Sequence, residues 1–254
     1  MHRNWTEHEL LIAMNLYCRL PFGQFDQSNK HVCEVAEKID RTPGALAMKL
    51  SNLASLDSYH QSRGVVGLRG ASNLDRKVWA SFQENWSNMA EKSEAAFESL
   101  LTDATISQTK TEIENYTPEG PSETERTVKA RRLQQFFRKV VLASYENRCT
   151  LTGIAVPQLL VASHIIPWSE NENRRADPTN GLCLNALHDK AFDRHLITFD
   201  EDFRLVVSSF LKKGEIPEFQ SANFAKLEGT TLTLPHRFAP DPYALKEHRN
   251  AFVT

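Results

Sequence analysis

The sequence predicts an α+β protein in two parts, a mainly helical region followed by a smaller unit of short strands and helices. Apolar residues recur at helical spacing through roughly the first hundred residues. A stretch rich in Thr, Ser, Glu and Pro then breaks this pattern, and short apolar runs separated by turn residues follow it. We therefore predict a helical domain over residues 1–105, a linker over 106–121 and a second domain over 122–254.

The helical domain begins with residues 6–9 (TEHE), a pattern typical of a capping box at a helix N-terminus. A second helix is expected over residues 30–39. Thr42 and Pro43 supply an N-cap and a proline at the first helical position, which predicts a third helix as far as Leu56. Further helical pattern is expected over residues 74–101.

The second and third helices, joined by a short turn, resemble a helix-turn-helix, and the opening Trp5 is similar to Myb-like DNA-binding domains. An ordinary helical bundle explains the same pattern equally well. The glycine-rich basic segment over residues 62–73 either contacts the DNA backbone or connects helices. If the region binds DNA, the expected contacts are Lys49, Ser51, Asn52, Arg63 and Arg69.

The net charge of −2 gives no argument for a polyanionic partner. Residues 126–139 form a local exception, because six basic residues and no acidic ones follow a capping box at residues 122–125. This predicts a basic helix that includes Arg131 and Arg132. Charge alone favours a solvated helix face balanced by acids elsewhere over a DNA-binding surface.

Composition also narrows the class of protein. No run approaches the roughly 20 apolar residues of a membrane span, and the start of the chain lacks the apolar core of a secretory signal, which predicts a cytoplasmic protein. The cysteines stand alone, without the short spacing of zinc clips, so a zinc finger is not expected.

The chemistry is expected in the second domain. Residues 149–153 are predicted to be a short strand and turn, and residues 159–164 a strand ending in His164; a polar loop follows over residues 167–179. Residues 180–184 then form a further short strand, and Asn185 caps a helix over 186–194 that carries His188, Asp189 and Asp193. A hairpin over residues 196–208 and a short helix near the C-terminus complete the domain.

The order His164, Asn180, His188 resembles the HNH endonuclease family, whose domain is a ββα-metal unit. The matching elements are SHIIP at residues 163–167, NGL at 180–182 and LHDKAFD at 187–193. The three elements in order are far more specific than any one alone. The resemblance spans roughly residue 126 to the C-terminus. It implies metal-dependent hydrolysis of DNA phosphodiester bonds to 5′-phosphate and 3′-hydroxyl ends.

The resemblance also implies roles for individual residues. His164 corresponds to the general base, because a neutral imidazole accepts a proton from water near neutral pH. Asn180 corresponds to the residue that ties the loop, and in some branches it also binds the metal ion. His188 corresponds to a metal ligand. The interpretation requires the side chains of His164 and His188 to meet across one phosphate.

Two departures from the family affect the metal site. Ser163 stands where many relatives carry a ligand, and Phe192 stands one turn after His188, where some carry a second histidine. Asp193 is a further candidate ligand, but it lies five residues after His188 and points to another face of the helix. A sparse site completed by water and phosphate suits Mg²⁺, with Mn²⁺ or another transition metal as alternatives.

The expected substrate is double-stranded DNA, with a homodimer as the economical way to cut both strands. Analogy suggests restriction or antiphage defence. Two alternatives remain open at this point, a DNA-binding regulator with an inactive HNH scaffold and a nuclease effector switched on by a ligand or partner. Further DNA contacts are expected from Arg174, Arg175 and Lys190.

Overall fold

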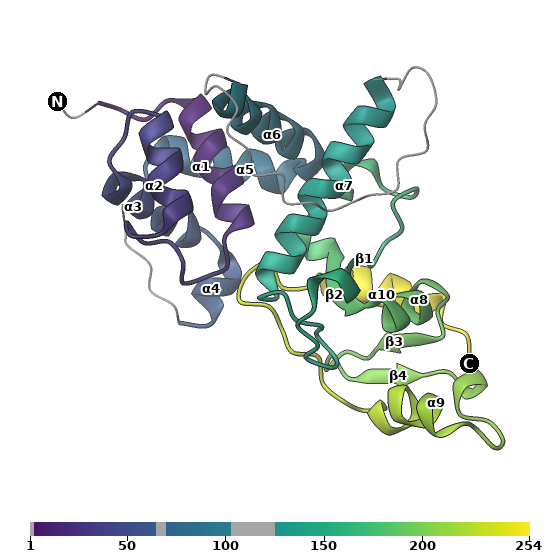
Figure 1. Ribbon diagram of the computed structural model, residues 1–254. Helices are drawn as coiled ribbons and strands as arrows, with labels where there is room; N and C mark the ends of the chain where they lie inside the picture. Colours follow the sequence, from purple (N-terminus) through teal and green to yellow (C-terminus); the bar gives the residue numbers. More distant parts are fainter. Residues whose placement is uncertain (1–2, 65–69, 103–124) are drawn as a thin grey trace.

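The computed structural model of the chain describes residues 3–64, 70–102 and 125–254 (Figure 1). A helical first part and a mixed second part confirm the predicted α+β class. The predicted linker and Arg69 lie outside the described residues, as does most of the capping box at residues 122–125. Within the described residues, no helix is both long and apolar enough to cross a membrane.

The first part consists of helices around a common apolar core. Thr6 accepts a hydrogen bond from Glu9 N and Glu9 caps in return, so the predicted capping box is present. The helical pattern predicted over residues 74–101 is confirmed, but it is divided between two helices, because Asn85 leaves helical geometry (φ −153°, ψ 86°) and its side chain caps the next helix at Asn88 N. The helices are α1 (Glu7–Arg19), α2 (Lys30–Lys38), α3 (Pro43–Ala54), α4 (Ser58–Ser62), α5 (Asn73–Glu84) and α6 (Trp86–Thr102).

The second part contains two antiparallel strand pairs, β1 with β2 and β3 with β4. Of the short strand and turn predicted over residues 149–153, the structure has the turn but not the strand. Gly153, at φ +71°, closes a tight turn whose Gly153 N donates to Cys149 O. The elements are α7 (Glu125–Ser144), β1 (Leu160–His164), β2 (Gly181–Asn185), α8 (Ala186–Asp193), β3 (Ile197–Phe199), β4 (Leu205–Val207), α9 (Glu218–Asn223) and α10 (Pro242–Asn250).

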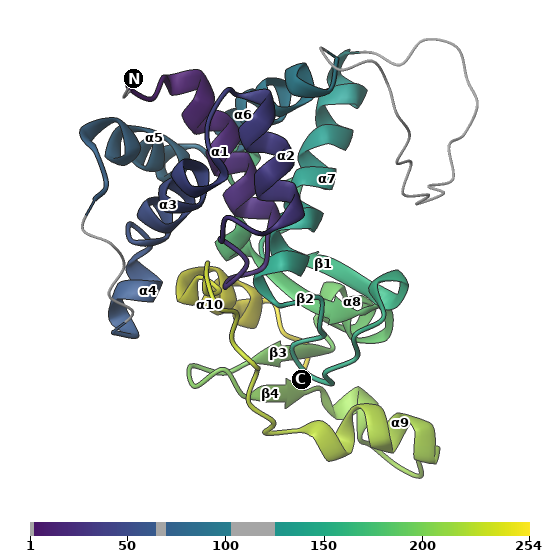
Figure 2. The ribbon, with the colours of Figure 1, turned by 60° about the vertical axis from the view of Figure 1, so that its left-hand side comes forward.

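Helix α7 belongs to both cores of the molecule. Leu133 and Phe136 pack with the buried residues of the first part, whereas Phe137 and Val141 pack with those of the second. Figure 2 shows α7 running from beside α1 and α6 down to β1 and β2. The helix that follows the predicted linker therefore joins the two parts through two neighbouring faces.

Arg237 provides a second connection between the parts. Its side chain is fully buried, and its guanidinium donates hydrogen bonds to the carbonyl oxygens of Tyr17, Cys18 and Leu20 at the end of α1. The last carbonyls of a helix have no partner within the helix, so a cation there is favourable. Phe238 extends the contact by packing edge-on against Tyr17.

Candidate active site

His164 is the last residue of β1, where it pairs across the ladder with Gly181 of β2. The glycine is needed at this position. A Cβ on Gly181 would lie 2.5 Å from Val141 Cγ2 and 2.8 Å from Phe137 Cζ, closer than real Cβ atoms come. Because Gly181 has no Cβ, α7 packs closely on the strand pair and places the Phe137 ring over the imidazole of His164.

The imidazole of His164 is held on three sides. Its Nε2 lies 3.0 Å from the carbonyl oxygen of Arg175, the Phe137 ring stacks on it at 3.7 Å between centroids, and Trp168 contacts it edge-on. A carbonyl oxygen only accepts hydrogen bonds, so Nε2 must carry the proton. The lone pair of the neutral ring is therefore on Nδ1.

The electrostatic surroundings keep His164 neutral. Burial lowers its pKa, and this outweighs the Arg175 carbonyl and the carboxylates of Asp193 and Asp177, which raise it. An imidazole with a lowered pKa is unprotonated at neutral pH and available to accept a proton. His164 thus has both the tautomer and the charge state that a general base requires.

Asn180 fastens the loop that follows His164. Its Oδ1 accepts a hydrogen bond from Ile166 N at 2.8 Å, and its Nδ2 donates to Ile166 O at 3.0 Å. Its own carbonyl accepts from Ile165 N. The amide thus ties the loop, the first of the two roles that the resemblance implies. Because Oδ1 and Nδ2 both bond to backbone, the geometry gives no support to Asn180 as a metal ligand.

His188 lies in the first turn of α8, but it is not directed at His164. Its ring is fully buried, with Nε2 at 2.7 Å from the carbonyl oxygen of Asn223 and Nδ1 at 2.9 Å from Asn185 Nδ2. Both nitrogens are therefore used inside the protein. The structure does not bring the two histidines to a shared phosphate, contrary to what the sequence led us to expect, and it leaves His188 no nitrogen for a metal ion.

Asp189 and Asp193 are the acidic residues that lie beside β1. They are four residues apart on α8 and so share a helix face. Burial raises the pKa of Asp189 and the nearby Asp193 raises it further, while Ser163 and Lys190 lower it. Asp193 also acts on the pKa of His164. The two carboxylates thus lie within electrostatic reach of the β1 end and of each other.

The sequence contains a signal for this acidic pair, but the signal is missed when spacings are counted from His188. Asp193 lies five residues from His188 and on a different face, as expected, but it lies four residues from Asp189. Counting from the aspartate instead of the histidine predicts a helical acidic pair. Asp189 is therefore the site residue that sequence reasoning missed.

The donor set at this pair fits a hard divalent cation. Two carboxylates on one helix face, one of them with a raised pKa, form a site in which a cation would relieve repulsion. The buried Ser163 Oγ lies close enough to Asp189 to lower its pKa, although it forms no hydrogen bond of standard geometry in the described part of the chain. That part contains no group of three or more His, Cys, Asp or Glu side chains able to hold a metal, so water and phosphate oxygens would have to complete the coordination.

The basic side chains expected to contact DNA differ in whether they are already paired with acidic side chains. Arg174 binds Asp177 and Asp241 at 2.9 Å each, and Arg175 binds Glu172 and the Trp168 carbonyl. Both support the loop over residues 167–179. Lys190, by contrast, is exposed on α8 next to Asp189.

Helix α7 carries the basic run that the sequence showed. Arg132 pairs with Glu98 at 3.0 Å and Lys129 with Glu91 at 2.5 Å, both acids being on α6, while Arg131 is exposed. Arg138 donates to the carbonyl oxygens of Leu160 and Pro157. These pairs match the expected helix face balanced by acids elsewhere.

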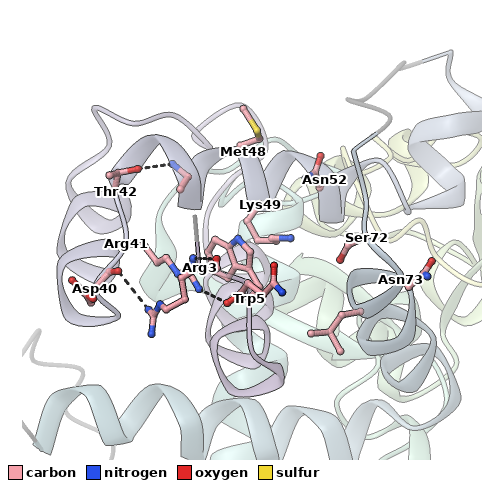
Figure 3. A pocket seen from close by; sticks show the side chains of 13 residues that line it. Arg3, Trp5, Asp40, Arg41, Thr42, Met48, Lys49, Asn52, Ser72 and Asn73 are labelled. Carbon is pink, nitrogen blue, oxygen red and sulfur yellow. Dashed lines mark hydrogen bonds between the residues drawn. The ribbon is translucent and has the colours of Figure 1, made fainter. Parts of the chain in front are cut away.

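A separate pocket of about 1070 Å³ lies in the helical part, between α3, residues 3–5 and the start of α5 (Figure 3). Lys49 lines it, but its ammonium group is paired with the carboxylate of Asp75 at 2.8 and 2.9 Å and lies 5.0 Å above the Trp5 ring. It is buried and so has no free charge to offer a phosphate. Asn52 lines the same pocket and is buried too.

Arg63, the remaining basic residue expected to contact DNA, lies at the end of α4 near the second part of the protein. Its guanidinium is exposed, donates to the carbonyl of His236 at 3.3 Å and lies over the Tyr59 ring. Among the basic residues named from the sequence, Arg63 and Lys190 are therefore exposed side chains with no acidic partner in the described part of the chain.

Comparison with known proteins agrees with this geometry. Residues 149–200 match the family model described as HNH endonuclease, a segment that contains His164, Asn180 and the acidic pair of α8. No curated protein matches the chain. The segment that is similar to HNH endonucleases thus carries a strand-end histidine, a loop-fastening asparagine and an acidic helix.

Proposed function

We propose that the protein is a metal-dependent DNA endonuclease that hydrolyses phosphodiester bonds to 5′-phosphate and 3′-hydroxyl ends. One observation carries the proposal. Within the segment that matches the family, a neutral imidazole with its lone pair on Nδ1 stands near two carboxylates on one helix face. General base and cation site are the two parts that this hydrolysis needs.

His164 is proposed to act through Nδ1. It accepts a proton from a water molecule whose oxygen forms the new bond to phosphorus, while the bond from phosphorus to the 3′ oxygen breaks. The departing 3′ oxygen takes a proton from solvent, and His164 then returns its own proton to solvent. Arg175 keeps Nε2–H engaged throughout, so the ring does not change tautomer between turnovers.

Asp189 and Asp193 are proposed to hold the cation, with Mg²⁺ as the expected ion and Mn²⁺ as an alternative. When bound, the ion would supply charge for the developing negative charge on the phosphate oxygens. Oxygen donors from two carboxylates, with water and phosphate as the rest, are typical of Mg²⁺ sites. His188 and Asn180 are assigned positioning roles inside the domain, because their polar atoms are engaged.

The setting of the reaction is also a proposal. Double-stranded DNA is the expected substrate, with Lys190 and Arg63 as the exposed cations best placed to contact phosphates. One such site cuts one strand, so a homodimer is proposed for cutting both. Restriction or antiphage defence in the cytoplasm is the biological context that we infer by analogy with the family.

Plasmid cleavage tests the proposal. Supercoiled DNA is incubated with the wild-type protein and Mg²⁺, Mn²⁺ or EDTA, and end labelling identifies the products. Cleavage is expected with either metal, none with EDTA, and none with His164→Ala. His31→Ala, at an exposed position on α2, is the matched control and should cleave normally. Tight DNA binding by the wild type without cleavage under any condition would instead identify a regulator with an inactive HNH scaffold.

A further inference from the structure

The loop between β1 and β2, residues 167–179, is fastened to the helical part of the protein. Ser87 Oγ of α6 donates a 2.6 Å hydrogen bond to the carbonyl oxygen of Glu172, and Asn85 Nδ2 lies 3.2 Å from Asn173 Oδ1. Ala176 of the same loop is fully buried in the core of the helical part. The loop therefore takes its position from α6 as well as from its own domain.

The same loop holds the imidazole of His164. The Arg175 carbonyl accepts from His164 Nε2, and Arg175 Nε donates to the carbonyl of Trp168, whose ring contacts the imidazole edge-on. Both groups that orient His164 from the loop side thus sit on the segment that α6 supports. The third, Phe137, comes from α7, which packs on α6 as well.

One carbonyl group connects the two sets of contacts. Glu172 O accepts from Ser87 Oγ and also from Arg175 N, at 3.5 Å across a short 3-10 turn. The contacts run from Ser87 of α6 to the Glu172 carbonyl, and from there to the N–H of Arg175. The carbonyl of Arg175 then contacts His164. Loss of the Ser87 bond would leave the carbonyl with only the longer contact and free the turn to shift.

We propose that Ser87 of α6 is a positioning residue for His164, so that the helical part of the protein sets the tautomer and orientation of the general base. This inference rests on the function proposed above. It makes the helical part a structural component of the nuclease site, and any partner that displaces α6 would alter catalysis through the loop.

Variants of the full chain test the inference. Ser87→Ala removes the hydroxyl, and Ser87→Thr retains one. Ser81→Ala is the matched control, because that hydroxyl bonds only to Lys77 O within α5. For Ser87→Ala we expect kcat for plasmid cleavage to fall about ten-fold, the apparent KM for DNA to stay unchanged, and Ser87→Thr to restore kcat, because small misplacements of a base are costly.

A second readout does not depend on cleavage. Ring ¹⁵N resonances of His164, recorded without metal at one fixed pH, report which nitrogen carries the proton. The wild type and Ser81→Ala should show the Nε2–H form, and Ser87→Ala a mixture with the Nδ1–H form. Asn85→Asp, which keeps the cap on Asn88 but cannot donate to Asn173, should shift the same resonances less.

The outcomes separate the two proposals. If the wild type fails to cleave DNA while Ser87→Ala changes the His164 tautomer, the positioning role stands and the nuclease function falls. If Ser87→Ala leaves both kcat and the ring resonances at wild-type values, the positioning role is overturned. A loss of kcat with unchanged ring resonances would likewise overturn it, since the effect would then not pass through His164.

Discussion

Two histidines of the same domain show how one residue type serves different purposes. His164 and His188 are both held by a backbone carbonyl at Nε2, from Arg175 at 3.0 Å and from Asn223 at 2.7 Å. They differ at Nδ1, which in His188 accepts from Asn185 and in His164 has no hydrogen-bond partner within the described residues. The second nitrogen therefore separates a proposed catalytic histidine from a structural one.

The largest effect is expected for His164→Ala. Removal of the general base should lower the rate of plasmid cleavage by about 1,000-fold, since general-base catalysis contributes roughly 10²–10⁴. DNA binding, measured by fluorescence anisotropy in EDTA, should stay at the wild-type level. Retention of more than a tenth of the wild-type rate would break the distinction between the two histidines.

The acidic pair should give the next largest effect. Asp189→Asn and Asp193→Asn are each expected to lower cleavage by about 100-fold at saturating DNA and to raise the Mg²⁺ concentration needed for half-maximal rate, because each removes a charged oxygen donor. Calorimetric titration with Mn²⁺ measures the metal affinity directly. Asp202→Asn, on the exposed β3–β4 turn, is the control and should change neither quantity.

His188→Ala should act on stability instead of chemistry. It removes the hydrogen-bond partner of the Asn223 carbonyl and one of the contacts of the Asn185 amide, and it creates a cavity. We therefore expect a loss of about 2–4 kcal/mol in the free energy of unfolding, measured with urea. Cleavage per folded molecule should persist at low temperature. Loss of cleavage with unchanged stability would instead return His188 to the metal site.

A third histidine, His248, is expected to make the free energy of unfolding depend on pH. His248 uses both nitrogens, with Thr198 and with the Phe192 carbonyl, and burial lowers its pKa to about 4. The unfolded chain, with a histidine pKa near 6.5, binds the proton more readily between these values. Its contribution to stability is therefore complete above pH 6.5 and is lost as the pH falls towards about 4.

The size of this loss is about 3 kcal/mol. Urea unfolding at a series of pH values should show a shallower decline in His248→Gln than in the wild type. Parallel curves for the two proteins would show that His248 is not a group that titrates on unfolding. Cleavage, in contrast, should follow the protonation of His164, with its acid limb below pH 6.5 because the pKa of that residue is lowered.

Local pattern was sufficient for the framework of the site. The strand that ends at His164, the loop closed by Asn180 and the capped helix behind it all follow from residues close in sequence, through alternation and capping. The hairpin predicted over residues 196–208 is likewise present, as the antiparallel pair β3 and β4. This is why the α+β class and the order of elements could be predicted.

The roles of His188 and Lys49 depend on residues far away in the sequence, so local sequence pattern could not predict them. His188 is enclosed by a carbonyl from Asn223, and Lys49 is neutralised by Asp75, a residue 26 positions away. Neither partner is visible from the motif that contains the histidine or the lysine. From sequence alone, a histidine in the first turn of such a helix is consistent with either a metal ligand or a buried structural residue. The contact of His188 with α9 distinguishes the two.

The buried guanidinium of Arg237 has a consequence for how the chain reaches its final state. It bonds to a carbonyl of Tyr17, 220 residues earlier. During synthesis α1 is made before Arg237, and its C-terminal end acquires this cap only after Arg237 has left the ribosome. Completion of the helical bundle is thus deferred until the segment that matches the HNH family has been made, which ties maturation of the two parts to one event.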